Sequence, residues 1–187
     1  MKSTVHEPVT TFNASLQAAL DTESAYRLLP AGTWLEGGCA LLAVALQKWV
    51  GGRLVTVGRE TCEGVVDHVV LQVDLQGGPC FMDYDGVQTR QALEDKVCKE
   101  WRFEAVSWGD FDAAMLEQAG VPVSALQSQA LSAELLGSGI FNLWKESPVL
   151  ACKSERIDQK RKLPTGGIIR GVSQYTQEFQ NDCSHRA

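Results

Sequence analysis

Three residues whose side chains can together carry out nucleophilic catalysis follow one another along the chain: Cys39, His68 and Asp83. Cys39 follows Gly37-Gly38 and begins an apolar segment that is typical of a buried helix. A thiol at a helix N-terminus lies near the positive end of the macrodipole, which favours the thiolate. An imidazole beside it can hold a proton and return it to a leaving group, while a carboxylate orients the ring. The residue types and their order therefore predict a Cys-His-Asp site.

His68 is the only histidine inside the expected fold, because His6 and His185 lie near the two ends of the sequence. Each member of the site also has a plainer interpretation. Free cysteine is among the most buried residue types, so Cys39 could be a small core residue. Asp85-Gly86 is a frequent turn pair, so the acidic segment could be only a turn. The combination of the three residues favours the catalytic interpretation.

The elements that must position these residues follow from periodicity and from Gly, Pro and capping residues. We expect helices over 14–29, 39–50, 89–101, 110–119 and 124–136, and strands over 53–58, 65–75, 80–84 and 103–108. Helices come first and a meander of strands follows, which predicts an α+β fold with an antiparallel sheet. The helix that begins at Cys39 is expected at the centre of the domain.

The choice of the third residue depends on the turn between two of the strands. If Gly77-Gly78 form a two-residue turn, simple pairing sets Asp85 diagonally beside His68 and leaves Asp83 further along the same face. A bulge or a longer loop brings Asp83 back beside the ring. Asp83 is the first candidate and Asp85 the reserve.

Three stretches carry a resemblance to a known superfamily. They are Trp34–Leu42 (WLEGGCALL), Asp67–Leu71 (DHVVL) and Phe81–Gly86 (FMDYDG). Together they resemble the papain-like cysteine hydrolases in the broad sense, especially the transglutaminase-like and arylamine N-acetyltransferase branches. The resemblance covers about residues 30–90 and concerns the order and context of the residues.

This resemblance implies a papain-like α+β fold in which Cys39 is the nucleophile, His68 the general base and acid, and Asp83 the orienting acid. The papain branch has a Gln several residues before its Cys, whereas this chain has Thr33, Trp34 and Glu36 there. An oxyanion hole would therefore depend mainly on the backbone N–H of Cys39.

Two residues are candidates for substrate binding. Trp34 lies five residues before Cys39 and could form a wall of a substrate cleft or serve as a packing anchor. Gly38 leaves the backbone N–H groups around the thiol accessible. The remaining thiols are expected to be reduced and incidental: Cys62, Cys80, Cys98, Cys152 and Cys183.

The formal net charge of −6 is unevenly distributed. Residues 1–144 carry 9 basic and 18 acidic side chains, and residues 145–187 carry 8 basic and 5 acidic ones. We interpret 1–144 as a papain-like α+β domain and 145–187 as an extended basic tail. The acidic domain argues against nucleic-acid binding. The sequence shows no secretory signal pattern, no apolar run of membrane-spanning length and no zinc-ligand spacing, so we expect a cytoplasmic protein without metal or cofactor.

The leading functional hypothesis is a thiol-dependent hydrolase or acyl transferase that acts on an amide or ester through a thioester on Cys39. Peptide cleavage, deamidation and transamidation share this chemistry, and a protein or peptide is the expected substrate or partner. The alternative is a non-catalytic binding or assembly protein on the same fold whose 145–187 segment docks on a partner.

Overall fold

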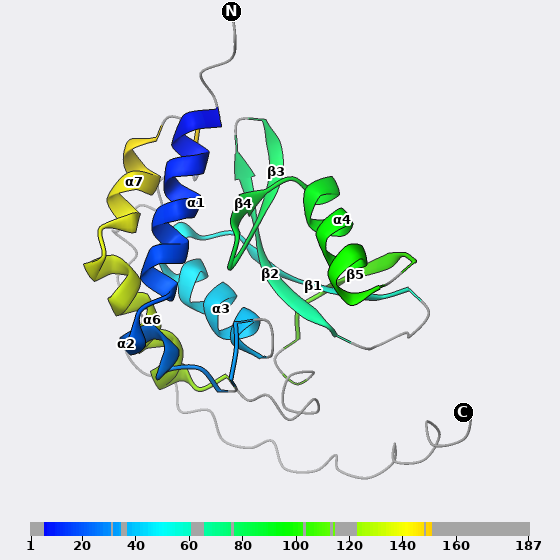
Figure 1. The fold of residues 1–187 in the computed structure, drawn as a ribbon, viewed down its shortest axis with the longest axis horizontal. Helices are drawn as coiled ribbons and strands as arrows, with labels where there is room; N and C mark the ends of the chain where they lie inside the picture. The colour runs from blue at the N-terminus through cyan, green and yellow to red at the C-terminus, as the bar shows by residue number, and fades with distance from the viewer. Residues whose placement is uncertain are drawn as a thin grey trace, which may run out of the picture. The chain divides into compact units, whose positions relative to one another are not determined.

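The computed structural model describes most of the chain up to Leu150 (Figure 1). The described residues are 6–30, 32–34, 37–60, 66–75, 77–102, 104–112, 114, 123–147 and 149–150. The chain divides into two units, Met1–Glu155 and Arg156–Ala187, and every described residue belongs to the first. Most of the predicted helix over 110–119, and the predicted tail beyond Leu150, lie outside the described residues.

The first unit combines helices with an antiparallel sheet, which confirms the α+β class. The helices are α1 (His6–Leu20), α2 (Glu23–Tyr26), α3 (Gly38–Val50), α4 (Arg90–Trp101), α6 (Ala125–Gly137) and α7 (Ile140–Glu146). The strands are β1 (Arg53–Arg59), β2 (His68–Leu75), β3 (Gly78–Asp83), β4 (Gly86–Gln88) and β5 (Val106–Asp110). They form one sheet in the order β4-β3-β2-β1-β5.

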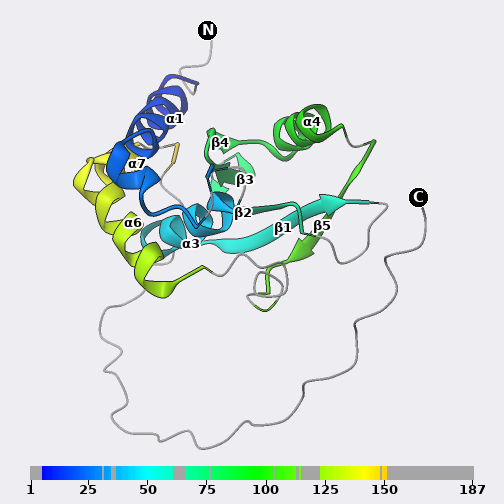
Figure 2. The same cartoon turned by 60° about the horizontal axis from the view of Figure 1, so that its bottom comes forward.

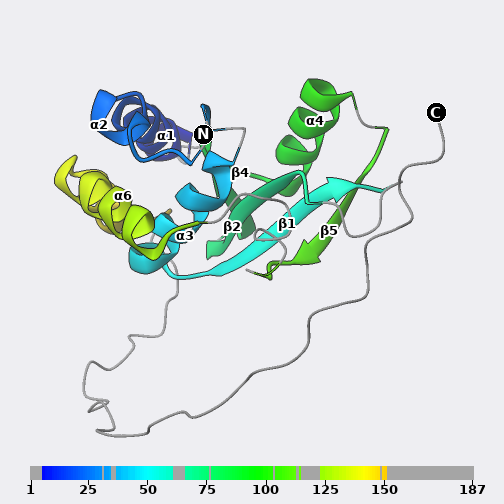
Figure 3. The same cartoon turned by 90° about the horizontal axis from the view of Figure 1, so that it is seen from below.

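Alternate residues of the strands enter two separate hydrophobic clusters, one on each face of the sheet. Val69, Leu71 and Met82 belong to the larger cluster, which contains residues of α1, α3, α6 and α7. Val70 and Phe81, one position away along their strands, belong to a smaller cluster with residues of α4. In Figures 2 and 3, α4 lies apart from the group that the other helices form.

The predicted helix over 14–29 is wrong in its bounds, because the segment forms two helices, α1 and α2. The side chain of Thr22 accepts a hydrogen bond from the backbone N–H of Ala25 and so begins a new helix where the prediction continued the old one. At the other end, α1 extends back to His6 and buries Phe12 with Leu16 and Leu20. Pro8 lies in the first turn of α1, where proline is tolerated, so it does not prevent this earlier start.

The central helix agrees with its prediction to within one residue. Gly37 precedes α3 with φ = +86°, a left-handed conformation that glycine adopts without steric cost. At the other end, the N–H of Gly51 donates to the carbonyl of Gln47 at 3.0 Å. Nine of the thirteen residues of α3 are buried, so the helix is enclosed on nearly every side. α3 packs on β2 and α6 and is therefore the central helix of the unit. Cys39 lies at its start.

The remaining described elements follow their predictions with small shifts. Thr89 and Ser124 cap α4 and α6, whose bounds lie within one residue of the predicted ones. β5 lies at 106–110 rather than 103–108, where Trp108 pairs with Val57 of β1. β4 was not predicted, because three residues are too few to show an alternating pattern.

The packed part of the chain continues past residue 144. α7 runs from Ile140 to Glu146, and Trp144 within it packs against Phe12 at a ring-centroid distance of 5.4 Å. Leu150 is fully buried in the larger hydrophobic cluster. No helix of the described residues is both long enough and apolar enough to span a bilayer.

Substitution of Gly38 by alanine is expected to destabilise the fold. A Cβ there would lie 2.6 Å from Leu29 Cδ2 and 2.8 Å from the carbonyl oxygen of Thr33. We expect Gly38→Ala to lower the free energy of unfolding by about 1–3 kcal/mol, the usual cost of overpacking. Gly137→Ala is the matched control, because it adds a methyl group in a helix with nothing within 4 Å. Guanidinium denaturation that showed equal effects for the two variants would contradict the expectation.

Candidate functional site

Cys39 is the second residue of α3 and lies in its first turn. The backbone N–H groups of a first helical turn have no partner within the helix and point toward the N-terminal end. The thiol therefore lies close to these N–H groups and to the positive end of the macrodipole. The Cys39 residue itself is only 7% exposed.

His68 is the first residue of β2 and is 1% exposed. Its backbone pairs with Val57 of β1, and its ring makes an edge-to-face contact with Trp101 at a centroid distance of 5.5 Å. Nε2 lies 3.1 Å from Oδ2 of Asp83. Because an ionised carboxylate can only accept, Nε2 carries the proton and donates it to Asp83. The other ring nitrogen, Nδ1, takes no part in this hydrogen bond.

Asp83 ends β3 and is 2% exposed. Its carboxylate accepts hydrogen bonds from four donors. Oδ2 accepts from Nε2 of His68 at 3.1 Å and from Nζ of Lys96 at 2.6 Å. Oδ1 accepts from Nε2 of Gln88 at 2.8 Å and from the backbone N–H of Asp85 at 2.9 Å. Both oxygens are therefore fixed, and the carboxylate has one orientation relative to the ring.

The pairing of β2 with β3 explains why Asp83 is the residue that reaches His68. Leu75 pairs with Gly78, so the hairpin turn lies one residue earlier than the predicted Gly77-Gly78 turn. This difference moves β3 by two residues along β2. The last observed pair of the two strands is Leu71 with Met82. If the register continues by one residue, Asp83 lies opposite Val70. Val70 is two residues from His68 and on the same face of the sheet, so Asp83 lies diagonally beside the ring.

Asp85 contacts other residues. Its Oδ2 lies 2.7 Å from Nζ of Lys96, and its Oδ1 accepts a hydrogen bond from Nε2 of Gln17 at 3.2 Å. The Asp85 side chain is 40% exposed, in contrast to 1% for that of Asp83. The reserve candidate is thus linked to the site only through Lys96 and through its backbone N–H.

The pKa of the Cys39 thiol lies below its ordinary value. Burial acts in the opposite direction and raises the pKa, but the adjacent His68 imidazole and the backbone N–H groups of Val69 and Ala40 lower it by more. Nδ1 of His68 has no hydrogen-bond partner of ordinary geometry among the described residues. Hydrogen-bonding and charge interactions with the His68 ring together favour the thiolate of Cys39.

The pKa of His68 is raised to about 9. Burial lowers it, but the hydrogen bond to Asp83 and the neighbouring Cys39 favour the imidazolium more strongly. Burial likewise raises the pKa of Asp83, and His68 with Lys96 reverses the effect so that the net shift is downward. The electrostatics of the site therefore favour the thiolate of Cys39, the imidazolium of His68 and the carboxylate of Asp83 relative to the same groups in isolation.

Trp34 and Gly38, the two candidate substrate-binding residues, lie beside each other at the start of α3. Trp34 is 3% exposed, donates from Nε1 to the carbonyl of Leu20 at 3.2 Å and stacks on Tyr84 at 6.5 Å. These contacts make Trp34 a packing anchor of the segment before Cys39. A role of either residue in binding substrate stays a prediction.

Lys96, Gln88 and Trp101 contact the His68–Asp83 pair and were not among the sequence candidates. The sequence did contain a signal for Lys96, which lies between Leu93 and Val97 on the apolar face of the predicted helix. A lysine at such a position is expected to have a buried partner. Gln88 and Trp101 gave no such signal, because both are ordinary residues at the ends of short elements.

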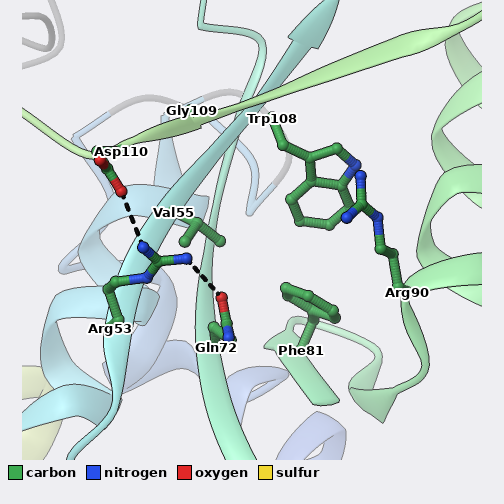
Figure 4. A pocket seen from close by; sticks show the side chains of 8 residues that line it. All are labelled: Arg53, Val55, Gln72, Phe81, Arg90, Trp108, Gly109 and Asp110. Atoms are coloured by element: carbon green, nitrogen blue, oxygen red, sulfur yellow. Dashed lines mark hydrogen bonds and ion pairs between the residues drawn. The ribbon is translucent and has the colours of Figure 1, made fainter. Parts of the chain in front are cut away.

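A pocket of about 220 Å³ lies elsewhere on the α4 face of the sheet (Figure 4). The guanidinium group of Arg53, in the wall of the pocket, donates hydrogen bonds to the Asp110 carboxylate at 3.1 Å and to Oε1 of Gln72 at 3.0 Å. Arg90 lies over the ring of Trp108 and is paired with a glutamate of its own helix. None of the three residues Cys39, His68 and Asp83 lines this pocket. Both guanidinium groups already have partners, so the pocket offers no unpaired charge to a ligand.

The described cysteines Cys39, Cys80 and Cys98 are free thiols. Burial raises the pKa of the Cys80 thiol, which is the opposite of the shift at Cys39. Among the described residues, no group of three or more His, Cys, Asp or Glu side chains is arranged to hold a metal ion.

Comparison with protein families, with curated protein sequences and with solved structures gives no match to this chain.

Substitution of Asp83 by asparagine is expected to lower the pKa of His68. The carboxylate favours the imidazolium, and loss of an adjacent opposite charge typically shifts a pKa by about 1–3 units. Asp85→Asn is the matched control, since Asp85 does not contact the ring, and should leave the pKa of His68 nearly unchanged. An NMR titration of the His68 Cε1–H resonance measures both. A larger shift in Asp85→Asn than in Asp83→Asn would show that the assignment of the third residue is wrong.

Proposed function

We propose that this protein is a thiol-dependent hydrolase or acyl transferase with a papain-like fold that attacks an amide or ester carbonyl through Cys39. One observation carries the proposal: the imidazole of His68 is held by Asp83 through Nε2 and lies close enough to the Cys39 thiol, in the first turn of the central helix, to lower its pKa. Nucleophile, base and orienting acid are thus connected in the order that activates a thiol.

The chemistry proceeds in two balanced steps. The Cys39 thiolate adds to the carbonyl carbon, and His68 donates the proton on Nδ1 to the leaving amine or alcohol as its bond to carbon breaks. A thioester on Cys39 and a neutral His68 remain. Water or an amine then adds to the thioester and gives its proton to Nδ1, the bond from carbon to sulfur breaks, and the thiolate and imidazolium are restored.

The charge distribution supports these roles. A pKa of about 9 keeps His68 protonated at neutral pH, and the interaction with this ring lowers the pKa of Cys39 and so increases its thiolate fraction. In the intermediate, negative charge develops on the carbonyl oxygen, which the backbone N–H of Cys39 can stabilise as an oxyanion donor. Asp83 stays ionised and keeps the ring oriented through both steps.

The substrate we propose is a protein or peptide, because hydrolysis of a peptide bond, deamidation of a side chain and transfer to an amine all pass through the same thioester. Trp34 and Gly38 are the residues we propose to lie beside the bound acyl group. No metal or cofactor takes part in either step.

A second candidate is a non-catalytic binding or assembly protein whose 145–187 segment docks on a partner. The burial of all three side chains supports it, because a thiol enclosed in a core is typical of a structural cysteine. The reactivity of Cys39 separates the two candidates.

Cys39 is expected to be the thiol that iodoacetamide alkylates fastest at pH 7, because its pKa is lowered while that of Cys80 is raised. His68→Ala should slow this reaction about tenfold for each unit by which the pKa of Cys39 rises. Mass-spectrometric mapping of every cysteine over time measures the rates, and Cys98→Ser serves as a control that leaves Cys39 unchanged. If Cys39 reacted more slowly than Cys80, the structural interpretation would replace the catalytic one.

The rate of acyl transfer from an anilide is expected to fall at both ends of the pH range. The rate should fall as pH rises through about 9, because His68 then loses the proton that the leaving group needs. On the acid side it should fall only below the ordinary pKa of a thiol, where the Cys39 thiolate becomes protonated. Turnover of p-nitroacetanilide, whose leaving amine must accept a proton, tests both limbs across the pH range. A single rise centred at the pKa of an ordinary thiol is incompatible with the ion pair.

A further inference from the structure

We propose that Lys96 is a positioning residue of this site, whose ammonium group keeps the Asp83 carboxylate ionised and directed at His68 and thereby supports the Cys39 thiolate. The inference deepens the proposed function and rests on it.

Lys96 bridges two carboxylates. Its Nζ lies 2.6 Å from Oδ2 of Asp83 and 2.7 Å from Oδ2 of Asp85, and its side chain is 16% exposed. The other lysine and arginine ion pairs of the described residues involve side chains that are 17–86% exposed. Lys96 is thus the described cation that reaches a fully buried carboxylate.

The position of Lys96 on α4 leaves its ammonium little choice of partner. Lys96 lies between Leu93 and Val97, which are both buried against the sheet. Its stem therefore runs along this apolar face, and its ammonium group comes out at the end of β3. The same helix ends with Trp101, whose ring contacts the His68 imidazole. One helix thus supports both sides of the His68–Asp83 pair.

Asp83 needs a cation because burial alone disfavours its ionised form. With His68 as its only charged partner, the buried carboxylate could take the proton from the ring, and the pair would then be neutral. Lys96 opposes this transfer, because its pKa is raised and it remains an ammonium group throughout the neutral range. It also occupies Oδ2 together with His68, which prevents the carboxylate from turning away.

The titratable groups that face this cluster come from four elements: Cys39 from α3, His68 from β2, Asp83 and Asp85 from β3 and the turn after it, and Lys96 from α4. From α1, the neutral Gln17 contacts Asp85. Removal of the Lys96 charge acts on Cys39 through Asp83 and His68, because it weakens the carboxylate that maintains the imidazolium. A less favoured imidazolium makes the thiolate less favourable.

The experiment compares the pH profile of Cys39 alkylation in the full-length protein and in variants at two lysines of α4. Lys96→Met removes the ammonium group and keeps the stem, whereas Lys96→Arg keeps the charge. Lys99→Met removes an exposed lysine of the same helix and is the matched control. We expect Lys96→Met to raise the midpoint of the profile by up to about one pH unit. The Lys96→Arg and Lys99→Met profiles should stay close to that of the unsubstituted chain.

The outcomes are distinguishable. If Lys96→Met lowers the denaturation midpoint but leaves the alkylation profile unchanged, Lys96 is only structural and the inference is wrong. If Lys96→Met does not fold, Lys96→Gln, which retains one donor for Asp83 without the charge, must give the same upward shift. A failure of the proposed function itself would be visible in the unsubstituted chain, where Cys39 would react no faster than Cys98 at any pH.

Discussion

The arrangement of this molecule depends on one buried carboxylate. Asp83 is 2% exposed, and its two oxygens accept hydrogen bonds from His68, Lys96, Gln88 and a backbone N–H. An ionised group in this position is stable only if its partners replace the water that it has lost. β2, β4 and α4 each contribute one of these side-chain partners, so they must meet at the end of β3 for the fold to be stable. The requirement that stabilises the buried charge also brings His68 to Cys39.

The position of the turn between β2 and β3 decides which aspartate lies beside His68. A shift of the turn by one residue moves β3 two residues along β2 and replaces Asp85 by Asp83 beside the ring. The two aspartates have the same chemistry, and the position of the turn decides their environments. Asp83 is buried next to His68, while the side chain of Asp85 is half-exposed and contacts Lys96 and Gln17. The glycine-rich turn therefore has a direct effect on the chemistry of the site.

The sequence predicted the parts of this site that depend on local patterns. The apolar segment after Gly38 predicted the central helix, and the alternating segment after His68 predicted its strand. The α1–α2 break was missed because a single capping residue, Thr22, outweighs a continuing apolar pattern. Lys96 was missed for a different reason. Its place on the apolar face of α4 indicated a buried partner, but the partner itself depends on the packing of α4 against the end of β3, which the periodicity of one segment does not encode.

The charges at the site alternate from one element to the next. A Cys39 thiolate, the His68 imidazolium, Asp83, Lys96 and Asp85 form a series in which each charge has neighbours of opposite sign. Each member is thus stabilised by its neighbours, and removal of one leaves the next uncompensated in a region of low dielectric constant. The exposed Asp85 ends the series at the surface, where water screens it. In the proposed function, the charge of the Cys39 thiolate is consumed when the thioester forms and is restored when the carbon–sulfur bond breaks.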